Sequence, residues 1–584
     1  MKRLITCRQA QELDAATKDA LGLDDIQLME KASVRLWDSL KSVVEKLASE
    51  GSIHKSIRDL RILALCGKGN NGGDALAVLR HAFSFGVENL EALLSADKPS
   101  ATCERQRRSA VLAGIPVRKW DEVSAEGWRE AAGRADIILD GVLGSGISGA
   151  ARGEAARMIS ALNSLVPPGP ESPRRPPIIV SIDVPSGLFS SWRKGAPLVK
   201  ADFTLSISPT KADCYTPDAR ERCGVIVDVA DIFPEKLIHA ECTKRAESAD
   251  IEQDTVSLLE EADLSLLNPP LPASSYKMSR GRLAILAGSK GRLGAAILCA
   301  RAALVSGAGY VSLFIDESLY EAAATALPSV IVRPEEEFGT EGTTCDAVLA
   351  GPGWGQSDKR YEQLASLLAM DVPLVLDADA LRLLTPSLWT RDGREPCVRK
   401  SDLILTPHPG EYAAMRAAGL DTVASVGLAT ESAEEPQGAE GQGFGSLLRN
   451  MTKATGATII LKSHVTWIAS PAGNMAVWDG MAPALGTAGS GDVLSGLAAG
   501  MLACRKAQRH KAEAGDSASE SPQLARRDTE DLAFDVARCA VLAHGLAGRR
   551  LAEDFGWFGA SDLIPACAGL LGRVKGNAPF CGRG

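Results

Sequence analysis

Gly486-Thr487-Ala488-Gly489-Ser490-Gly491-Asp492-Val493-Leu494-Ser495-Gly496 is the stretch of this 584-residue sequence that says most about its fold. Its small residues let successive backbone N–H groups converge on an anion where a helix begins, and the helix dipole adds partial positive charge there. Asp492 follows this anion site, close enough to take a proton from a hydroxyl that attacks a phosphoryl group. The stretch predicts a phosphate-handling loop in an α/β domain. A plain helix start with an Asp in its first turn is the alternative.

Short apolar runs of strand character precede polar or Gly-rich loops throughout the chain. This alternation is typical of parallel sheets, in which ligands bind at the carboxyl ends of the strands. No Walker A sequence is present, so a P-loop enzyme is not indicated. The expected strands are residues 282–286, 347–349, 373–376, 403–405 and 458–461 in the second half, and 61–66, 135–140, 178–183, 203–207 and 225–229 in the first.

Further loops of the second half carry candidate ligand-binding residues. Gly288-Ser289-Lys290-Gly291-Arg292-Leu293-Gly294 and Gly351-Pro352-Gly353-Trp354-Gly355 follow strands and are rich in glycine. Asp377-Ala378-Asp379 ends another strand and adds carboxylates. His408 ends a strand between two prolines that fix the local backbone, so a structural and an active-site role both stay open. Lys462-Ser463-His464-Val465-Thr466 could line a nucleotide or be an exposed strand end.

Three polar loops lie at strand ends in the first half. Gly67-Lys68-Gly69-Asn70-Asn71-Gly72-Gly73-Asp74 joins a strand to a helix, and its glycines let a ligand approach backbone N–H groups. Asp140-Gly141-Val142-Leu143-Gly144-Ser145-Gly146 and Asp183-Val184-Pro185-Ser186-Gly187 each begin with a carboxylate. A carboxylate, an amide oxygen and a hydroxyl form a hard-oxygen set that suits a monovalent or divalent cation. Capping of the adjacent helix or turn is the alternative for each loop taken singly.

Composition and charge narrow the class of protein. Lys and Arg total 64 against 73 Asp and Glu, a formal charge of −9 without a basic arm or stripe, so nucleic-acid binding is not indicated. The 13 Cys are scattered and form no CxxC pair, which favours a reducing cytoplasm over a disulfide framework or a zinc site. The sequence shows neither a signal-peptide core nor an apolar stretch long enough to span a bilayer. We therefore expect a cytoplasmic protein without a membrane partner.

The chain is expected to form two large α/β domains. A charged and then Pro-rich segment separates them, with Asn268-Pro269-Pro270-Leu271-Pro272 near its end. Residues 1–240 are assigned to the first domain, 241–278 to the linker and the start of the second domain, and 279–584 to the second domain. Three segments of small, polar and charged residues are predicted to be solvated insertions, namely 166–177, 431–443 and 505–529.

The first 240 residues resemble the NAD(P)H-hydrate epimerase family, which has a Rossmann-like fold. The resemblance rests on Gln27-Leu28-Met29-Glu30-Lys31-Ala32 and on the three loops, although Lys68 and Ala75 stand where Pro and Gly are usual. It implies a potassium ion held by Asn71, Asp140 and Ser186. It also implies that Asp183 is catalytic, either as a base or by orienting the ring. The implied contacts of the hydrated nicotinamide nucleotide are Asn70, Asn71, Gly72, Gly73, Asp74, Gly144, Ser145, Gly146, Ile147, Ser148, Gly149, Ala150 and Asp183.

Residues 252–584, apart from the insertions, resemble the ADP- or ATP-dependent NAD(P)H-hydrate dehydratases, which have a ribokinase-like fold. The loops of the second half carry this resemblance, although Ser463 stands where Gly is usual. It implies phosphorylation of the ring hydroxyl of the S-epimer followed by loss of phosphate, with Asp492 as a catalytic residue and Mg²⁺ accompanying the nucleotide. The hydrate is implied to contact Ala296 (or its neighbour Ala295), Gly353, His408 and Asp492, and the adenine nucleotide Lys462, Ser463, His464, Val465, Thr466 and Gly491.

The two resemblances together predict a bifunctional metabolite-repair enzyme, both an isomerase and a lyase. It would interconvert the R and S hydrates of NADH and NADPH (NADHX and NADPHX). It would return the S form to NAD(P)H at the expense of ADP or ATP, giving AMP or ADP and phosphate. A potassium ion and a homo-oligomeric assembly are expected with it. Two alternatives stay open: a ribokinase-like kinase of a vitamin precursor fused to a non-catalytic Rossmann-like binding module, and a first domain that acts as a binding module of the kind used in RNA-processing scaffolds.

Overall fold

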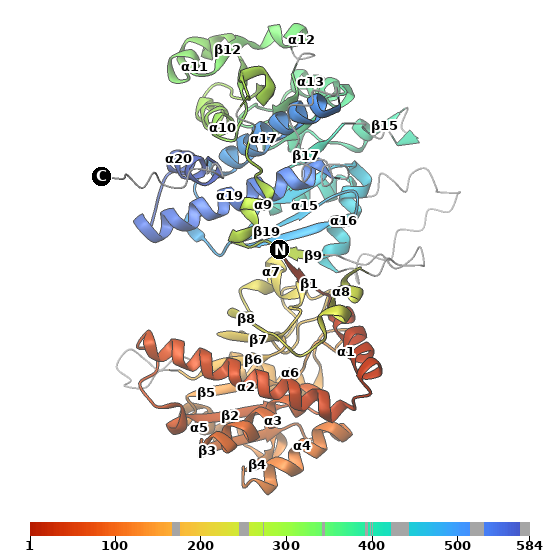
Figure 1. Ribbon diagram of the computed structural model, residues 1–584, viewed down its shortest axis with the longest axis vertical. Helices are drawn as coiled ribbons and strands as arrows, with labels where there is room; N and C mark the ends of the chain where they lie inside the picture. Colours follow the sequence, from red (N-terminus) through yellow and green to blue (C-terminus); the bar gives the residue numbers. More distant parts are fainter. Residues whose placement is uncertain are drawn as a thin grey trace. The chain divides into compact units, whose positions relative to one another are not determined.

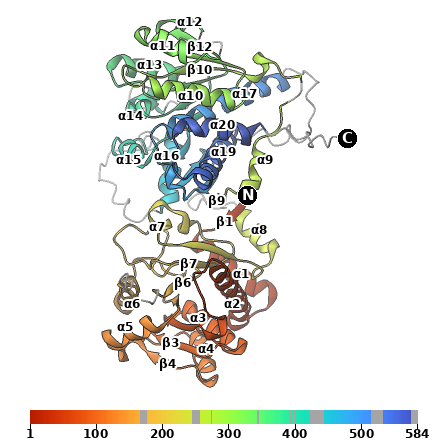
Figure 2. The same cartoon turned by 90° about the vertical axis from the view of Figure 1, so that its left-hand side faces the viewer.

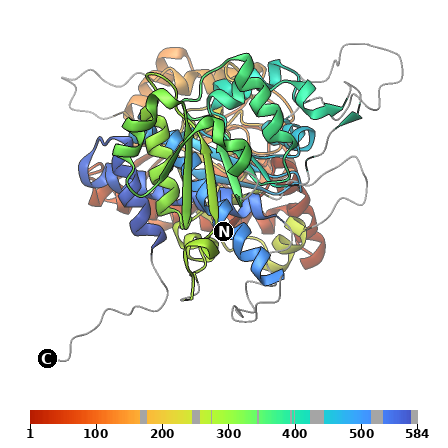
Figure 3. The same cartoon turned by 90° about the horizontal axis from the view of Figure 1, so that it is seen from above.

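The computed structural model describes residues 1–165, 176–243, 256–271, 274–341, 345–391, 395–396, 399, 401–421, 443–513 and 531–572. The chain forms two compact units, one containing residues 3–256 and the other most of residues 257–584. Each unit is a sheet covered by helices (Figures 1 and 2). In Figure 3 the green strands and helices of the C-terminal unit lie nearest the viewer.

A seven-stranded parallel sheet forms the centre of the N-terminal unit. Successive strand residues point to opposite faces, so Ile62 and Ala64 join one apolar core while Leu63 and Leu65 join the other. Both faces are buried, which explains why the strands read as continuous apolar runs. The strands are β2 (Arg61–Cys66), β3 (Asn89–Leu94), β4 (Val117–Lys119), β5 (Ile137–Gly141), β6 (Ile178–Ile182), β7 (Phe203–Ile207) and β8 (Val225–Val229); a short β1 (Lys2–Leu4) precedes them.

Helices cover both faces of this sheet. Helices α2 (Asp25–Ser49) and α3 (Asn70–Phe85) pack on one face, and α5 (Ala125–Arg134) and α6 (Gly153–Asn163) pack on the other. The remaining helices are α1 (Cys7–Leu21), α4 (Ala101–Leu112), α7 (Pro217–Arg220) and α8 (Glu235–Thr243).

The strand order β4-β3-β2-β5-β6-β7-β8 places a topological switch point between β2 and β5. The chain moves outward from β2 to β4, and then from β5 to β8 in the opposite direction. The loops after β2 and β5 therefore turn away from each other and leave room for a ligand at the carboxyl ends of the strands. The Gly67–Asp74 loop and the Asp140–Gly146 loop lie at this point.

The C-terminal unit contains a larger mixed sheet with the order β9-β20-β19-β18-β17-β14-β13-β10-β11-β12. The pairs from β12 to β18 are parallel, and the β18-β19-β20 pairs are antiparallel. The switch point falls between β10 and β13. The strands are β9 (Val256–Leu258), β10 (Arg282–Leu286), β11 (Tyr310–Ile315), β12 (Ile331–Pro334), β13 (Ala347–Ala350), β14 (Leu374–Leu376), β17 (Leu403–Leu405), β18 (Thr458–Leu461), β19 (Val465–Ala469) and β20 (Met475–Asp479), with a separate hairpin of β15 (Thr390–Arg391) and β16 (Glu395–Pro396).

Helix α17 (Ser490–Glu513), which begins inside the Gly486–Gly496 stretch, packs closely on α10 (Leu293–Val305). A Cβ atom on Gly496 would lie 2.3 Å from the backbone oxygen of Cys299, so only glycine permits this approach. The other helices of the unit are α9 (Leu264–Leu267), α11 (Tyr320–Ala326), α12 (Phe338–Glu341), α13 (Asp358–Ala369), α14 (Asp379–Arg382), α15 (Pro409–Ala417), α16 (Phe444–Thr455), α19 (Leu532–Phe555) and α20 (Ala560–Leu571).

One of the predicted insertions needs correction. Residues 505–513 are the last turns of α17 and not the start of a solvated insertion. Most side chains from Arg505 to Lys511 are partly buried, and their Lys, Arg, Gln and Ala composition alone does not separate the end of a helix from a loop. Residues 166–175, 431–442 and 514–529 of the predicted insertions lie outside the described residues.

The segment assigned to the linker and the start of the second domain contains regular structure. It includes β9 and α9, and Leu259, Leu264 and Leu267 join the core of the C-terminal unit. Within the described ranges, no helix combines the length and the apolar character needed to cross a bilayer.

Candidate active sites

The site of the N-terminal unit forms where the loops after β2 and β5 meet. Gly67 and Gly72 allow close backbone packing there, because a Cβ on Gly67 would lie 1.9 Å from the oxygen of Val142. Asn71 is buried, and a Cβ on Gly144 would lie 3.2 Å from its side chain. Its amide nitrogen Nδ2 forms no hydrogen bond with the described residues. A buried amide N–H group without an acceptor is unusual and indicates that an acceptor atom of a ligand or a water molecule completes its contacts.

Asp140 lies at the end of β5 and is fully buried. Its carboxylate accepts hydrogen bonds from Ser181 Oγ at 2.7 Å, from Ser186 Oγ at 2.5 Å and from the Ser186 N–H at 2.9 Å. These donors are neutral, and burial raises the pKa of the Asp140 carboxyl despite them. Ser186 Oγ also accepts a hydrogen bond from the Leu143 N–H at 2.8 Å, which joins the loops after β5 and β6. The predicted cation ligands Asn71, Asp140 and Ser186 are thus drawn from neighbouring loops of one site.

Asp183 follows β6 and has a left-handed backbone with φ of 67°. Its carboxylate is paired with the ammonium of Lys211, a residue that the sequence analysis did not select. Lys211 lies four residues after the end of β7, and the signal for it in the sequence is weak because no loop motif surrounds it. Sheet order places β6 beside β7, so the tertiary structure brings the two side chains together.

Asp74 lies in the first turn of α3 and is buried. Burial raises the pKa of its carboxyl well above the ordinary value, and the negative charges of Asp183 and Asp14 add to this effect. The site therefore contains a carboxyl group that favours its neutral, proton-donating form, next to a carboxylate held by a lysine.

The remaining predicted substrate contacts line the rim of this site. Gly72 and Gly73 are buried in the first turn of α3, whereas Asn70 is exposed. In the loop after β5, Gly144, Ser145 and Ile147 are partly exposed and Gly146, Ser148, Gly149 and Ala150 are exposed. Helix α1 reaches this rim, because Gln11 Nε2 donates a hydrogen bond to the Ser145 carbonyl at 3.2 Å.

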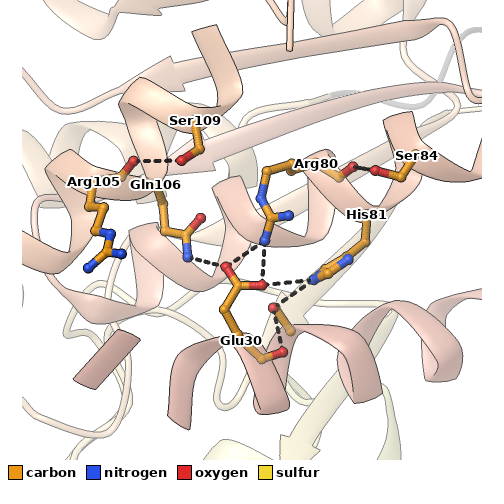
Figure 4. A network of polar contacts seen from close by, with 8 residues as sticks. Glu30, Arg80, His81, Ser84, Arg105, Gln106 and Ser109 are labelled. Atoms are coloured by element: carbon orange, nitrogen blue, oxygen red, sulfur yellow. Dashed lines mark hydrogen bonds and ion pairs between the residues drawn. The ribbon is translucent and has the colours of Figure 1, made fainter. Parts of the chain in front are cut away.

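A polar network holds α3 in place behind the loop (Figure 4). Glu30 of α2 accepts hydrogen bonds from Arg80 of α3 and from Gln106 of α4, at 2.8 Å for Gln106. The neighbouring Met29 packs under the loop, since its side chain would lie 2.9 Å from a Cβ on Gly73. The Gln27–Ala32 motif thus packs against the first turns of α3 and holds the Gly67–Asp74 loop in position.

The site of the C-terminal unit forms at the carboxyl ends of β10, β13, β14 and β18. The loops after β10 and β13 are joined by a hydrogen bond from Ser289 Oγ to the Gly353 carbonyl at 2.8 Å. The Asp379 carboxylate accepts the Gly355 N–H at 2.9 Å and pairs with Arg292 at 2.7 Å. Four loops that are distant in the sequence therefore share one edge of the sheet.

The phosphate-handling loop lies at the N-terminus of α17. Gly489 has φ of 90°, and a Cβ there would lie 2.5 Å from Leu298 Cδ1, so the loop requires glycine at this position. Ser490 contacts His544 of α19: the imidazole Nε2 is 3.1 Å from Ser490 Oγ and 3.1 Å from its carbonyl oxygen. Burial lowers the pKa of His544 to about 4, so the ring is neutral. The sequence analysis missed His544, which lies 54 residues away from the loop.

Asp492 lies next to two further charged groups. The pKa of its carboxyl is raised from 3.8 to about 6, mainly by burial and then by the charge of Asp377, while the charge of Lys462 opposes the shift. Lys462 Nζ is 2.7 Å from Asp377 Oδ1 and would be 3.2 Å from a Cβ on Gly491. The ammonium therefore stands beside the anion loop, as expected for a group that binds phosphate.

His408 caps α15, because its Nδ1 accepts the Gly410 N–H at 3.0 Å and the Glu411 N–H at 3.3 Å. Its side chain is 48% exposed, so the ring keeps an open face. Ala296 is fully buried in the core, whereas its neighbour Ala295 lies against Gly353. The structure thus favours Ala295 over Ala296 as a side chain that faces a ligand.

The predicted nucleotide segment forms the turn between β18 and β19. Ser463 Oγ donates to the Val465 carbonyl at 2.6 Å, and Thr466 Oγ1 donates to the Ser463 carbonyl at 3.1 Å. Val465 is buried, while His464 is exposed. Across the described ranges, no group of three or more His, Cys, Asp and Glu side chains is placed to hold a metal ion.

Comparison with known proteins assigns both units. Residues 25–212 match the family model described as YjeF-related protein N-terminus, and residues 283–566 match the model described as NAD(P)H-hydrate dehydratase. The chain belongs to the family of bifunctional NAD(P)H-hydrate repair enzymes. The predicted fold class of two α/β domains, the first with a parallel sheet, is confirmed.

Curated relatives of this repair family resemble the chain over most of its length. The bifunctional NAD(P)H-hydrate repair enzyme of Moorella thermoacetica is 29% identical, over 85% of this chain and 87% of its own. The enzyme of Escherichia coli is 27% identical, over 86% of this chain and 83% of its own. Among solved structures, an ADP/ATP-dependent NAD(P)H-hydrate dehydratase from Bacillus subtilis, co-crystallised with ATP and Mg²⁺, is 25% identical over 55% of this chain and 98% of its own, with a TM-score of 0.40.

Proposed function

We propose that the protein repairs hydrated nicotinamide nucleotides with two activities in one chain. The N-terminal unit interconverts the R and S hydrates of NADH and NADPH. The C-terminal unit dehydrates the S form, using ADP or ATP and releasing AMP or ADP with phosphate. The observation that supports this most directly is that each family-matched segment places charged side chains together at one edge of its sheet. They surround Asp183 in the first segment and Asp492 in the second.

In the dehydratase site, Asp492 is proposed to take the proton from the ring hydroxyl as that oxygen attacks the terminal phosphoryl group of the nucleotide. A pKa of about 6 leaves this carboxylate ionised at neutral pH and basic enough to accept a proton. The N–H groups at the start of α17 and the ammonium of Lys462 offset the negative charge of the phosphates. The C–O bond to the phosphate group then breaks, with its electron pair leaving on the phosphate. The adjacent ring carbon loses a proton to water, and the electron pair of that C–H bond restores the ring double bond.

The nucleotide contacts are assigned to Gly491 and to the turn from Lys462 to Thr466. Lys462 stands nearest the anion loop, and Ser463 holds the turn closed through its hydrogen bond to Val465. Mg²⁺ would arrive with the nucleotide phosphates and supply further charge neutralisation. Gly353, His408 and the 295–296 segment are proposed to meet the hydrate, together with Asp492.

In the epimerase site, the donor set fits a potassium ion. Asp140 is a buried carboxylate with neutral hydrogen-bond partners, and Asn71 presents a buried amide beside it. Together with Ser186 these residues would hold the ion, which would supply the positive charge that such a buried carboxylate needs. The loops Asn70–Asp74 and Gly144–Ala150 are proposed to bind the hydrated nucleotide, with Asp183 at its reacting ring.

The remaining features of the proposal are organisational. We propose domain limits of 1–240 for the epimerase and 279–584 for the dehydratase, with the segment 241–278 between them. A cytoplasmic location and a homo-oligomeric state are proposed as well, with small molecules as the only ligands.

The decisive experiment incubates the purified protein with a mixture of R and S hydrates of NADH and with ADP or ATP in turn. The absorbance of the reduced nicotinamide should return completely with the right nucleotide, since epimerisation supplies the S form as it is consumed. Recovery of the S fraction alone would refute the epimerase assignment. A phosphorylated organic product without return of absorbance would identify the chain instead as a small-molecule kinase.

A further inference from the structure

Lys211 is a buried lysine at the carboxyl edge of the N-terminal sheet. Its side chain is 3% exposed, and that of Asp183, its partner, is 10% exposed. The ammonium donates to Asp183 Oδ1 and, at 2.7 Å, to the carbonyl oxygen of Ile207 at the end of β7. Lys211 therefore binds one carboxylate oxygen and one strand-end carbonyl, and its burial keeps it from contacting a ligand directly.

The backbone of Asp183 explains why this carboxylate needs a fixed partner. A left-handed φ of 67° is uncommon outside glycine, so the contacts around Asp183 must hold its backbone in this conformation. The Asp183 N–H still donates to the Leu205 carbonyl at 2.9 Å, so the chain turns sharply directly after its last sheet hydrogen bond. The turn and the ion pair together set the direction of this side chain.

The position of Lys211 is itself held by the N-terminal segment. Ile5 N–H donates to the Thr210 carbonyl at 3.1 Å, and Ala212 N–H donates to the Ile5 carbonyl at 2.8 Å. The backbone of Lys211 is thus clamped from both sides. A side chain whose backbone is fixed by a separate segment can hold its partner to a narrow range of positions.

A contribution to stability alone does not account for the pair. Removing two charges from water carries a desolvation penalty for each ion, so a buried ion pair is often no more stabilising than apolar side chains of similar volume. The described residues form no hydrogen bond to the second oxygen, Oδ2, of Asp183, although the side chain is largely buried. The pair thus leaves one carboxylate oxygen fixed in direction and available at the ligand edge.

The groups that face Asp183 come from three other elements. Asp74 approaches from α3, and Cys7 from α1. Asp213 lies in η3 (Ala212–Tyr215), where its Oδ2 accepts the Cys7 N–H at 3.3 Å. Lys211 is the cation among these groups, and its ammonium offsets the negative charge of the Asp183 carboxylate.

We propose that Lys211 is a positioning residue of the epimerase, which holds the ionised Asp183 carboxylate with Oδ2 toward the reacting ring, opposite the carboxyl group of Asp74. This inference rests on the proposed epimerase function. It predicts that loss of Lys211 weakens the chemical step more than it weakens binding, because the ligand contacts themselves are left in place.

The test measures interconversion of the purified R hydrate by chromatography, with the full-length protein and without nucleotide. Lys211→Met should lower kcat about 100-fold with KM changed by less than about threefold, the pattern expected when a reacting group is displaced while binding is kept. In Lys211→Ala, ethylammonium should restore part of kcat in proportion to its concentration, and the neutral isostere ethanol should not. The Lys55→Met variant is the matched control, since Lys55 pairs with Asp136 at 2.7 Å on the exposed amino side of the same sheet.

Each outcome decides the inference. A Lys211→Met variant with unchanged kcat, or with a raised KM alone, would overturn it. So would a Lys211→Ala variant that ethylammonium does not rescue, because a purely structural role predicts a loss that no small cation repairs. The rate at which the same samples dehydrate the S hydrate shows whether their C-terminal unit is folded. Absence of R–S interconversion in the unaltered protein would instead refute the proposed epimerase function, and the role of Lys211 with it.

Discussion

Replacing Asp377 by Asn should move the acid limb of the dehydratase pH profile to lower pH. The limb is expected near the pKa of Asp492, about 6, because the ionised carboxylate is the form that accepts the proton of the attacking hydroxyl. The charge of Asp377 is the second cause of the raised pKa, after burial. Removing that charge favours the ionised form of Asp492, so its pKa falls and activity persists to lower pH.

The size of the shift follows from the order of these effects. The pKa of Asp492 lies about 2 units above 3.8, and burial contributes more than Asp377 does. The expected displacement is therefore about 0.5 to 1 unit, or about 0.7 to 1.4 kcal/mol of differential interaction. Lys462 acts in the same direction, because the substitution removes its 2.7 Å partner and leaves its charge to act on Asp492.

The assay follows the return of reduced-nicotinamide absorbance from the S hydrate at subsaturating hydrate and nucleotide, from about pH 5 to about pH 8, because kcat/KM under these conditions reports the pKa of the free enzyme. Asp346→Asn is the matched control: Asp346 lies directly before β13, at the amino edge of the sheet, and also pairs with a cation, Arg282, so its loss should leave the limb in place. A limb in Asp377→Asn that stays or moves upward would refute this reasoning. Persistence of the limb in Asp492→Asn would show that another group titrates.

Three other predictions follow from the two sites. Asp492→Asn should abolish dehydration of the S hydrate while R–S interconversion by the same sample continues; loss of both activities would contradict separate sites. The neutral, buried His544 has its pKa lowered from 6.5 to about 4, so the unfolded chain binds more protons in this window and stability falls as pH drops from about 6.5 to about 4, by up to about 3 kcal/mol. Thermal melting across that range should show a smaller slope in His544→Gln, and an equal slope would count against the assignment. Asp140→Ala should lower epimerase kcat and remove any preference for K⁺ over Na⁺; epimerisation that persists with its ion preference intact would exclude the cation site.

Much of the architecture could be predicted from local sequence. Apolar runs such as residues 61–66 and 458–461 form strands, because both faces of a parallel sheet are buried and each residue must be apolar. The helix start at Ser490 was predicted from the small residues before it, because a tight turn into a helix requires small residues. Residues 505–513 were assigned wrongly to an insertion. They form the end of α17, and a segment rich in Lys, Arg, Gln and Ala can be either a helix end or a loop.

The candidate sites divide in the same way. Strand-end loops identified Asp140 and Asp183, since every carboxyl end of a parallel strand lies on one edge of its sheet, and the small-residue helix start identified Asp492. Lys211 and His544 carried no motif, and their roles depend on contacts with residues 28 and 54 positions away. Motif spacing does not encode such contacts.

The sequence by itself determined the α/β class of both units and the candidate ligand-binding loops. Both can be read locally, because the spacing of apolar residues and the placement of glycines are patterns of a few residues. The tertiary structure alone decided the electrostatics of each site. Asp74 and Asp492 have raised pKa values because strand order buries them and brings other carboxylates close. The ammonium groups of Lys211, after β7, and Lys462, after β18, offset the negative charges of Asp183 and Asp377. Burial and long-range pairing depend on the packed fold, and for that reason they cannot be obtained from local pattern.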